Sequence, residues 1–331
     1  MESSNSISVT AIIPTKNRSS DLEHTLESVF GQRILPTQLI IVDQGQGDET
    51  KKRVENLFAE TRFRVREKVQ FCYIHNTMIS GLTVARNRAM EVARGDIWLF
   101  LDDDVILEAN FLEELLTVYQ RYPQVTGVSG IISNYRRPSL PYRLWAFAFA
   151  RGPFHDERQV VYWQADRLRV SEPIAVTKLG GGLMSFRGNA IRGRCFDENL
   201  CGVSYGEDVD FCARLGPDAL LVIAPRARLV HKKSPIGRLQ DHWLRGFARA
   251  NQYLYHRNWE RGFRNRLAFV WLNIGLGLVA SLASVRRASL APWRALRKGA
   301  HEGTMVGRPL PVTHGNEPQA TTDRARFGSQ L

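Results

Sequence analysis

Cysteine is scarce in this sequence, and so is any apolar segment at its start. The four cysteines, Cys72, Cys195, Cys201 and Cys212, form no C-x-x-C pair and no pattern of a small secreted disulfide framework. We therefore expect free or buried thiols in a reducing compartment. Residues 1–8 are short and polar and lack the apolar region of a secretory signal. We expect no signal peptide and a cytoplasmic location.

Acidic residues are nearly absent from one long stretch near the C-terminus. Between Arg226 and Lys298 there are 16 Lys and Arg residues but only two acids, Asp241 and Glu260. The whole chain carries a formal net charge of +12, and its positive excess lies mainly here. Such an excess favours an anionic partner, which could be nucleic acid, an acidic membrane or a phosphorylated substrate.

The apolar pattern of the rest of the chain predicts an α/β fold. With 331 residues, 44% of them apolar, there is material for one large domain or two smaller ones. Branched apolar runs at residues 8–13, 38–43 and 69–74 predict strands, the first stopped by Pro14, and helical spacing separates them. Strands that alternate with helices in this way form a parallel sheet. We therefore expect a mostly parallel, Rossmann-like sheet flanked by helices.

Further elements follow in the second half of the chain. The pattern predicts a helix at 110–122 and strands at 125–133 and 220–224. Residues 138–177 are rich in aromatic side chains, which could line an acceptor groove, but ordinary packing of an irregular insert is the preferred interpretation.

Three consecutive carboxylates, Asp102, Asp103 and Asp104, follow the apolar run at residues 98–101. This run predicts a buried strand, so the carboxylates lie at its C-terminal tip, where open α/β sheets bind ligands. Like charges side by side repel one another unless a cation or a set of donors compensates them. Oxygen ligands suit Mg²⁺ or Mn²⁺, completed by a substrate's phosphates. The alternative is a solvated Asp-rich turn without a ligand.

Glycines and a second pair of acids stand farther along the chain. Gly180, Gly181 and Gly182 permit a close approach of the backbone to a ligand, although a flexible turn would need them as well. Glu207 and Asp208 open a predicted helix, where acids are also favoured simply as a cap.

Taken together, these segments resemble the family 2 glycosyltransferases, inverting enzymes with the GT-A fold. The likeness covers residues 9–231 and depends on six fragments in the expected order. These are residues 12–18 (IIPTKNR), 41–43 (IVD), Gly81 with 85–87 (ARN), 101–104 (LDDD), 181–182 (GG) and 206–210 (GEDVD). The loop after Asp43 departs from the commonest pattern, because Gln44 and Gln46 stand where an acid and a serine are often found.

The resemblance implies transfer of a sugar from a nucleotide diphosphate sugar to a hydroxyl, with inversion at the anomeric carbon. It implies a divalent ion, Mn²⁺ or Mg²⁺, and a carboxylate that deprotonates the acceptor. The residues implied for donor binding are Pro14, Thr15, Asn17, Asp43, Arg86, Asn87, Asp102 and Asp103. Those implied for the metal are Asp102, Asp104 and His231, although a lone histidine after a strand is often only a packed residue. Asp208, with Glu207, is implied for catalysis, and Gly181 and Gly182 for the acceptor.

The basic C-terminal stretch contains residues 267–283, which are uncharged and flanked by arginines on both sides. Seventeen residues are near the lower limit for a membrane-spanning helix. We favour a helix that lies in the surface of an anionic membrane, and a spanning anchor or a soluble packing or dimer helix remain as alternatives. We expect a glycosyltransferase domain at 1–235, with a donor-binding half at 1–135 and an acceptor half at 136–235. A helical, membrane-associating region at 236–305 and a disordered tail at 306–331 would follow.

This position predicts a peripheral or monotopic enzyme on the inner face of the cell membrane. Its acceptor would be a lipid-linked glycan or a growing surface polysaccharide, and no nucleic acid is expected as a partner. One rival is a nucleotidyltransferase, although residues 14–17 are not the Gly-rich basic loop usual there. Another is a catalytically dead protein that binds membranes or nucleic acid. Such a protein would explain the positive net charge but would give no function to the carboxylates of residues 102–104 or to Glu207 and Asp208.

Overall fold

The computed structural model describes residues 7–60, 63–135, 138–151, 171–200, 205–233, 243–258 and 262–307. The strands are β1 (Val9–Thr15), β2 (Gln38–Asp43), β3 (Gln70–His75), β4 (Ile97–Leu101), β5 (Val105–Leu107), β6 (Val125–Ile132), β7 (Ile174–Val176), β8 (Leu183–Arg187) and β9 (Leu220–His231). The helices are α1 (Ser19–Phe30), α2 (Glu49–Glu60), α3 (Phe63–Lys68), α4 (Leu82–Val92), α5 (Phe111–Arg121), α6 (Leu140–Trp145), η1 (Ala146–Arg151), α8 (Gly188–Ile191), α9 (Glu207–Arg214), α10 (Trp243–Asn258), α11 (Phe263–Arg287) and α12 (Ala291–Gly307).

The nine strands form one mixed sheet. Their order is β3-β2-β1-β4-β8-β6-β9-β5, with β7 also paired to β9. The strands β3, β2, β1 and β4 are parallel to one another, as the sequence predicts. Strand β8 runs antiparallel between β4 and β6. Thr15 of β1 stands beside Asp43 of β2, and Asp43 stands beside His75 of β3. The polar ends of these strands therefore meet at one edge of the sheet.

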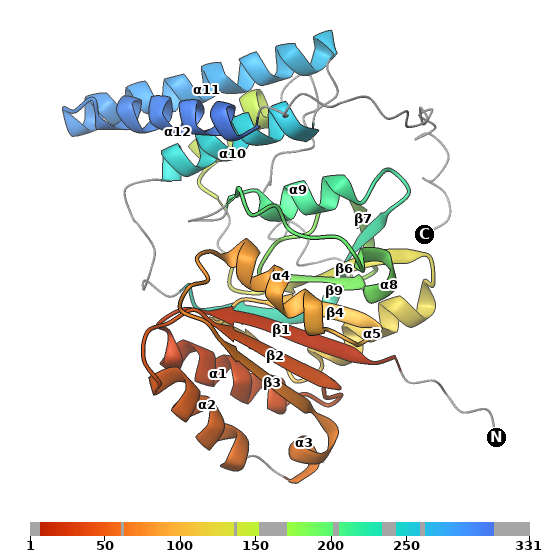
Figure 1. Cartoon of the computed structure of the whole chain (residues 1–331). Coiled ribbons are helices and arrows are strands. Elements are labelled where there is room, and N and C mark those ends of the chain that lie inside the picture. The colour runs from red at the N-terminus through yellow and green to blue at the C-terminus, as the bar shows by residue number, and fades with distance from the viewer. Residues whose placement is uncertain are drawn as a thin grey trace, which may run out of the picture.

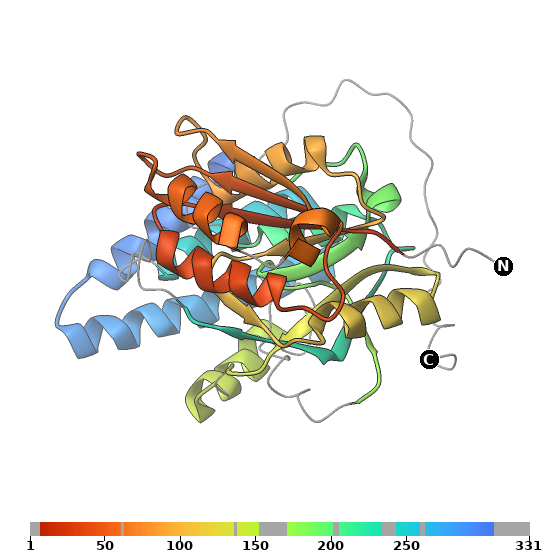
Figure 2. The ribbon, with the colours of Figure 1, turned by 90° about the horizontal axis from the view of Figure 1, so that it is seen from below.

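Helices cover both faces of this sheet, and residues alternate between the two layers. Ala11 and Ile13 of β1 pack in the core that includes α1 and α5, while Ile12 packs against α4 and α9. Every residue of β1, β2 and β4 is buried, as expected for strands that are covered on both sides. Figure 1 shows α4 and α9 above the sheet, and Figure 2 shows α1 and α2 in front of it when seen from below.

Two strand ends differ from those predicted by more than one residue, and proline explains both. β1 continues through Pro14 to Thr15, because β4 pairs with β1 only as far as Ile12 and the missing N–H of Pro14 costs no bond on that side. The strand predicted at 220–224 continues to His231. Its pairing with β6 is interrupted between Ile223 and Arg228, and Pro225 falls in this irregular part.

The basic stretch near the C-terminus forms three helices, α10, α11 and α12, stacked above α9 (Figure 1). This confirms the helical character expected of that region. In the described part of the chain, α11 alone is long and apolar enough to cross a membrane, and 28% of its most apolar window is buried. Helix α12 was not predicted as a separate element and extends to Gly307, so residues 306 and 307, where the tail was expected to begin, are helical. Residues 308–331 lie outside the described residues, as does Cys201 among the cysteines. Cys72, Cys195 and Cys212 are free thiols.

Candidate functional site

The three carboxylates lie in the turn between β4 and β5, at the polar edge of the sheet. Thr25 of α1 fixes this turn, because its buried hydroxyl lies within hydrogen-bonding distance of the Asp103 and Val105 carbonyls and of the Val105 N–H. The sequence predicts the position of the carboxylates at the strand tip. It did not reveal that Val105 begins a separate strand, β5, which pairs with β9.

Asp103 points away from its two neighbours. Thr15 Oγ1 donates to Asp103 Oδ2 over 2.7 Å, and an Arg18 guanidinium nitrogen lies 2.9 Å from Oδ1. Burial raises the pKa of Asp103 to about 6 in spite of these favourable contacts. Asp103 therefore ties the carboxylate turn to the end of β1 and the start of α1.

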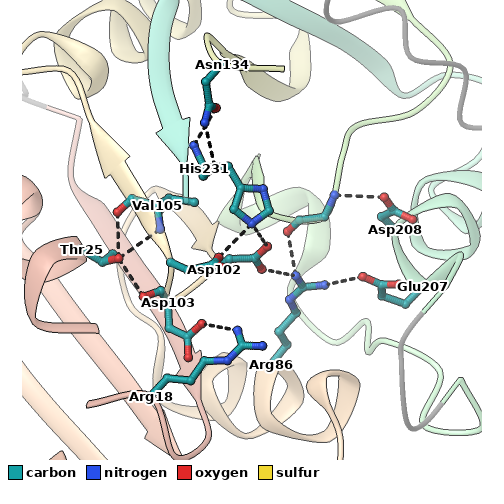
Figure 3. A network of polar contacts seen from close by, with 12 residues as sticks. Arg18, Thr25, Arg86, Asp102, Asp103, Val105, Asn134, Glu207, Asp208 and His231 are labelled. Carbon is teal, nitrogen blue, oxygen red and sulfur yellow. Dashed lines mark hydrogen bonds and ion pairs between the residues drawn. The ribbon is translucent and has the colours of Figure 1, made fainter. Parts of the chain in front are cut away.

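Asp104 and Asp102 instead face His231, at the end of β9. Figure 3 shows Asp102 beside the His231 imidazole. Nε2 of His231 lies 2.9 Å from Asp104 Oδ1 and 4.0 Å from Asp102 Oδ2. One ligand atom from each residue lies within 4.8 Å of the others. Asn134 positions the His231 backbone with two hydrogen bonds, one in each direction. Two carboxylates and an imidazole that converge in this way suit a divalent ion such as Mn²⁺.

Arg86 of α4 connects this cluster to the second pair of acids (Figure 3). The side chain is fully buried, and its guanidinium lies 3.1 Å from Glu207 Oε1 and 3.7 Å from Asp102 Oδ1. It also donates to the Gly181 carbonyl over 2.7 Å. One buried cation thus balances carboxylates from two regions that are 105 residues apart in the chain.

Gly181 and Gly182 are glycines because carboxylates occupy the space beside them. A Cβ on Gly181 would lie 2.8 Å from Glu207 Oε1, and a Cβ on Gly182 would lie 2.5 Å from Asp102 Oδ2. Both distances are shorter than side chains tolerate. The N–H of Gly181 also donates to Asp208 Oδ2 over 3.0 Å. The two glycines thus let the turn before β8 pass close to both groups of acids.

Burial and mutual repulsion shape the electrostatics of Glu207 and Asp208, in the first turn of α9. Burial raises the pKa of Glu207, the charge of Asp208 raises it further, and Arg86 opposes both effects. Burial also raises the pKa of Asp208, against the hydrogen bonds from the Val209 and Gly181 N–H groups. A carboxyl with a raised pKa is a stronger base than one in water.

Asn17 and Asp43 meet at the ends of β1 and β2, around the loop that begins at Gln44. The N–H of Gly45 donates to Asp43 Oδ1, and the Tyr73 hydroxyl donates to Asp43 Oδ2 over 2.6 Å. Asn17 has a left-handed backbone with φ of 55° and accepts a hydrogen bond from the Gln46 N–H. Pro14 and Thr15 lie beside them in β1, so the structure gathers four of the predicted donor residues along one edge.

Asn87 is not at this edge. Its side-chain amide bonds both the carbonyl and the N–H of Phe196 and donates to Glu198, so it holds the segment before α9. Arg86 lies over the Phe196 ring, 5.3 Å from its centroid. Neighbouring residues of α4 thus support the site in two different ways.

Four residues of the site were not singled out from the sequence: Arg18, Thr25, Tyr73 and Asn134. Arg18 stands within the fragment at residues 12–18, and Asn134 directly follows the strand predicted at 125–133, so position after a strand was a usable signal for both. Thr25 and Tyr73 lie inside a helix and a strand, and only the tertiary structure reveals their role.

The comparisons with known proteins agree with this geometry. Residues 10–168 match the model of Glycosyl transferase family 2. The chain carries a glycosyltransferase domain of family 2. The match includes the carboxylate turn and Arg86, while Gly181, Glu207, Asp208 and His231 of this glycosyltransferase lie beyond its end.

Named relatives are similar over part of their length. A glucosyl-dolichyl phosphate glucuronosyltransferase of Haloferax volcanii is 28% identical over 126 residues, which is 38% of each chain. The succinoglycan biosynthesis protein ExoM of Rhizobium meliloti is 26% identical over 231 residues, 69% of this chain and 67% of ExoM. The chain thus matches little more than a third of the first relative and about two thirds of the second.

The fold is that of the GT-A glycosyltransferases. The mannosyltransferase PcManGT of Pyrobaculum calidifontis, solved in complex with GDP-Man and Mn²⁺, superposes with a TM-score of 0.55. The superposition covers 91% of this chain and 86% of PcManGT at 17% sequence identity.

Proposed function

We propose that this glycosyltransferase moves a sugar from a nucleotide diphosphate sugar to a hydroxyl of a membrane-associated glycan, with inversion at the anomeric carbon. The observation that carries the proposal is the convergence of Asp102, Asp104 and His231 beside Arg86 at the C-terminal edge of β4. Ligands of α/β sheets bind at this edge. PcManGT was solved with GDP-Man and Mn²⁺, which supports a nucleotide sugar and a divalent metal here.

Asp102, Asp104 and His231 are the residues that would hold the ion, Mn²⁺ or Mg²⁺. When bound, such an ion neutralises the negative charge that develops on the departing diphosphate. Asp103 does not face the cluster, because Thr15 and Arg18 hold its carboxylate. Its part in donor binding would be to fix the turn rather than to contact the donor.

The nucleoside would bind along the edge formed by Pro14, Thr15, Asn17 and Asp43. Asp43 is 1% exposed and already accepts two hydrogen bonds, so it would shape the loop at Gly45. Arg86 would hold Asp102 and Glu207 in place close to the donor. Asn87 would contribute only indirectly, through Phe196.

Asp208 is proposed as the general base. Both of its oxygens accept backbone N–H bonds, from Gly181 and Val209, so the carboxylate is oriented before any substrate arrives. It would take the proton of the acceptor hydroxyl as that oxygen attacks the anomeric carbon, while the diphosphate leaves on the opposite side. Glu207 would support it by keeping Arg86 in place, and Gly181 and Gly182 would contribute to the acceptor site by letting the backbone lie against the carboxylates.

The proposed acceptor and location rest on helices α10, α11 and α12, which form a three-helix layer. We propose that the chain divides at about residue 235 into the glycosyltransferase domain and a helical region that binds the inner face of the cell membrane. The glucosyl-dolichyl phosphate in the name of one relative supports a lipid-linked acceptor, and the succinoglycan in that of the other supports a glycan.

The test is a panel of nucleotide diphosphate sugars with Mn²⁺, Mg²⁺ or a chelator, on wild type, Asp104→Ala and Asp208→Asn. We expect one donor to bind only with metal and only when Asp104 is present. Asp208→Asn should bind that donor normally and transfer its sugar at least about 100-fold more slowly. The exposed Asp218, in the loop between α9 and β9, supplies a matched control, Asp218→Asn. Normal turnover by Asp208→Asn would remove Asp208 from its role, and the absence of any donor would refute the proposed reaction.

A further inference from the structure

A basic pocket lies in the three-helix layer, outside the site described above. It has a volume of about 390 Å³ and is formed where α10 begins, α11 ends and α12 begins. Its cations are Arg245, Arg287, Arg294 and Lys298, from all three helices. None of the described residues that line it is acidic. Glu302, one turn along α12, pairs with Arg245 and offsets one of the four charges.

The floor of the same pocket is apolar. Trp243, Leu244, Ala283 and Pro292 line it between the cations. Trp243 is about half exposed, and an indole at such a position is typical of membrane interfaces, where one end is apolar and the other is wet. A purely polar anion would leave this apolar lining without a partner, so the pocket suits an anion attached to an apolar chain.

An apolar row runs along the side of α11 that faces away from this pocket. Exposed side chains recur every three or four residues along one side of the helix, at Phe263, Leu267, Val270, Trp271, Ile274, Leu278, Leu282 and Val285. The opposite side, at Ala268, Leu272, Leu276 and Ala280, is buried. Ala283 and Arg287, which line the pocket, follow Leu276 and Ala280 on this opposite side, so the pocket and the exposed row lie on different sides of the helix. Leu290, in the connection to α12, is 67% exposed.

We propose that this pocket binds the phosphate group of an anionic membrane lipid, while the exposed row on the other side of α11 contacts the apolar interior of the same membrane. The cations match the charge of the phosphate, and a helix that lies in the membrane surface has its apolar side in the acyl region and its other side at the level of the phosphates. The pocket would therefore fix the position and the orientation of the three-helix layer on the membrane. A diffuse attraction between basic protein and acidic lipid would not do so. This inference rests on the membrane association proposed above.

The test uses the full chain and sedimentation with vesicles of phosphatidylcholine, with or without phosphatidylglycerol. Arg294→Gln with Lys298→Gln removes two exposed pocket charges. The matched control, Arg266→Gln with Arg297→Gln, removes two exposed charges of α11 and α12 that do not line the pocket. We expect the pocket variant to lose roughly tenfold or more of its affinity for the anionic vesicles, and the control to lose much less.

Equal losses in both variants would overturn the proposal, because the attraction would then be diffuse. No loss in either would overturn it as well. Inorganic pyrophosphate tests the other source of phosphate: if it binds without vesicles as tightly as the lipid and displaces the vesicles, the pocket is not a lipid site. Donor binding, measured on the same preparations, should be unchanged in the pocket variant. A protein that binds vesicles through the pocket but binds no donor would refute the proposed reaction and leave this inference standing.

Discussion

At the scale of single residues, the site depends on the directions in which neighbouring carboxylates point. Asp102 and Asp104 face His231, while Asp103, between them, faces Thr15 and Arg18. The alternation lets one short turn place two candidate metal ligands on one side and an anchor on the other. Arg86 then limits the repulsion among the remaining acids, because it contacts both Asp102 and Glu207.

Gly182→Ala tests how closely the glycines fit these carboxylates. The added methyl group would lie 2.5 Å from Asp102 Oδ2, the movable end of a side chain, so the carboxylate should turn away while the fold remains. We expect metal-dependent donor binding to weaken by about tenfold or more, equivalent to about 1.4 kcal/mol, with little change in the melting temperature. Isothermal titration with Mn²⁺ and the donor measures this.

Gly262→Ala is the matched control, since a Cβ there meets nothing within 4 Å and its φ of −110° suits any residue. Donor binding by that variant should equal that of wild type. If Gly182→Ala bound metal and donor normally, Asp102 would not be a ligand.

The dependence of the rate on pH tests Asp208. A base acts only when deprotonated, and burial raises the pKa of this carboxyl, so it becomes protonated at a higher pH than an ordinary aspartate. We expect kcat/KM to rise with pH and to reach its plateau well above the ordinary aspartate pKa of about 3.9. Glu207 titrates beside it, so the profile reports the pair. A rate already constant near pH 4, under conditions where the fold persists, would contradict the role of Asp208.

At the scale of elements, local pattern and long-range pairing contributed differently to what the sequence could predict. The strand at 38–43 and the helical spacing before it follow from the apolar pattern, and the structure has both, as β2 and α1. The carboxylate turn is also local, because it directly follows a buried run. The continuation of β9 to His231 is not local, since it depends on pairing with β5 and on a bulge around Pro225.

The same distinction applies to the candidate site. His231 and Arg86 were proposed through the family resemblance and Asp102 from its place after a buried run, but their proximity results from three elements that meet in space. No spacing in the sequence shows that Asn87 turns toward Phe196 while Arg86, one residue earlier, turns toward Glu207. Adjacent residues of a helix point about 100° apart, so only the packing of α4 decides which of them reaches the site.

At the scale of the whole molecule, the neighbours of α11 indicate how it would meet a membrane. One side of the helix is buried in the layer, and Trp145 of α6 donates to the carbonyl of Gly275 on that side. Helix α12, which packs along α11, carries Arg294, Arg297 and Lys298. A spanning α11 would have to leave these partners or take the charges of α12 into lipid, at several kcal/mol. The arrangement favours a helix that lies in the membrane surface.

Replacing Ile274 and Leu278 by serine tests this orientation. Both side chains are about half exposed in the middle of the apolar row, so the change should remove membrane contact without opening the core. Burying a large aliphatic side chain contributes about 1.5–3 kcal/mol, and these two are already half covered by protein. We therefore expect binding to neutral phosphatidylcholine vesicles to fall by roughly tenfold or more, while donor binding is unchanged. The control is Ile34→Ser with Val92→Ser, at two similarly exposed positions outside α10, α11 and α12, and it should leave vesicle binding intact. If the Ile274 and Leu278 variant remained with the vesicles and resisted extraction at high pH, α11 would span the membrane instead, and the layer of α10, α11 and α12 would have to open to allow it.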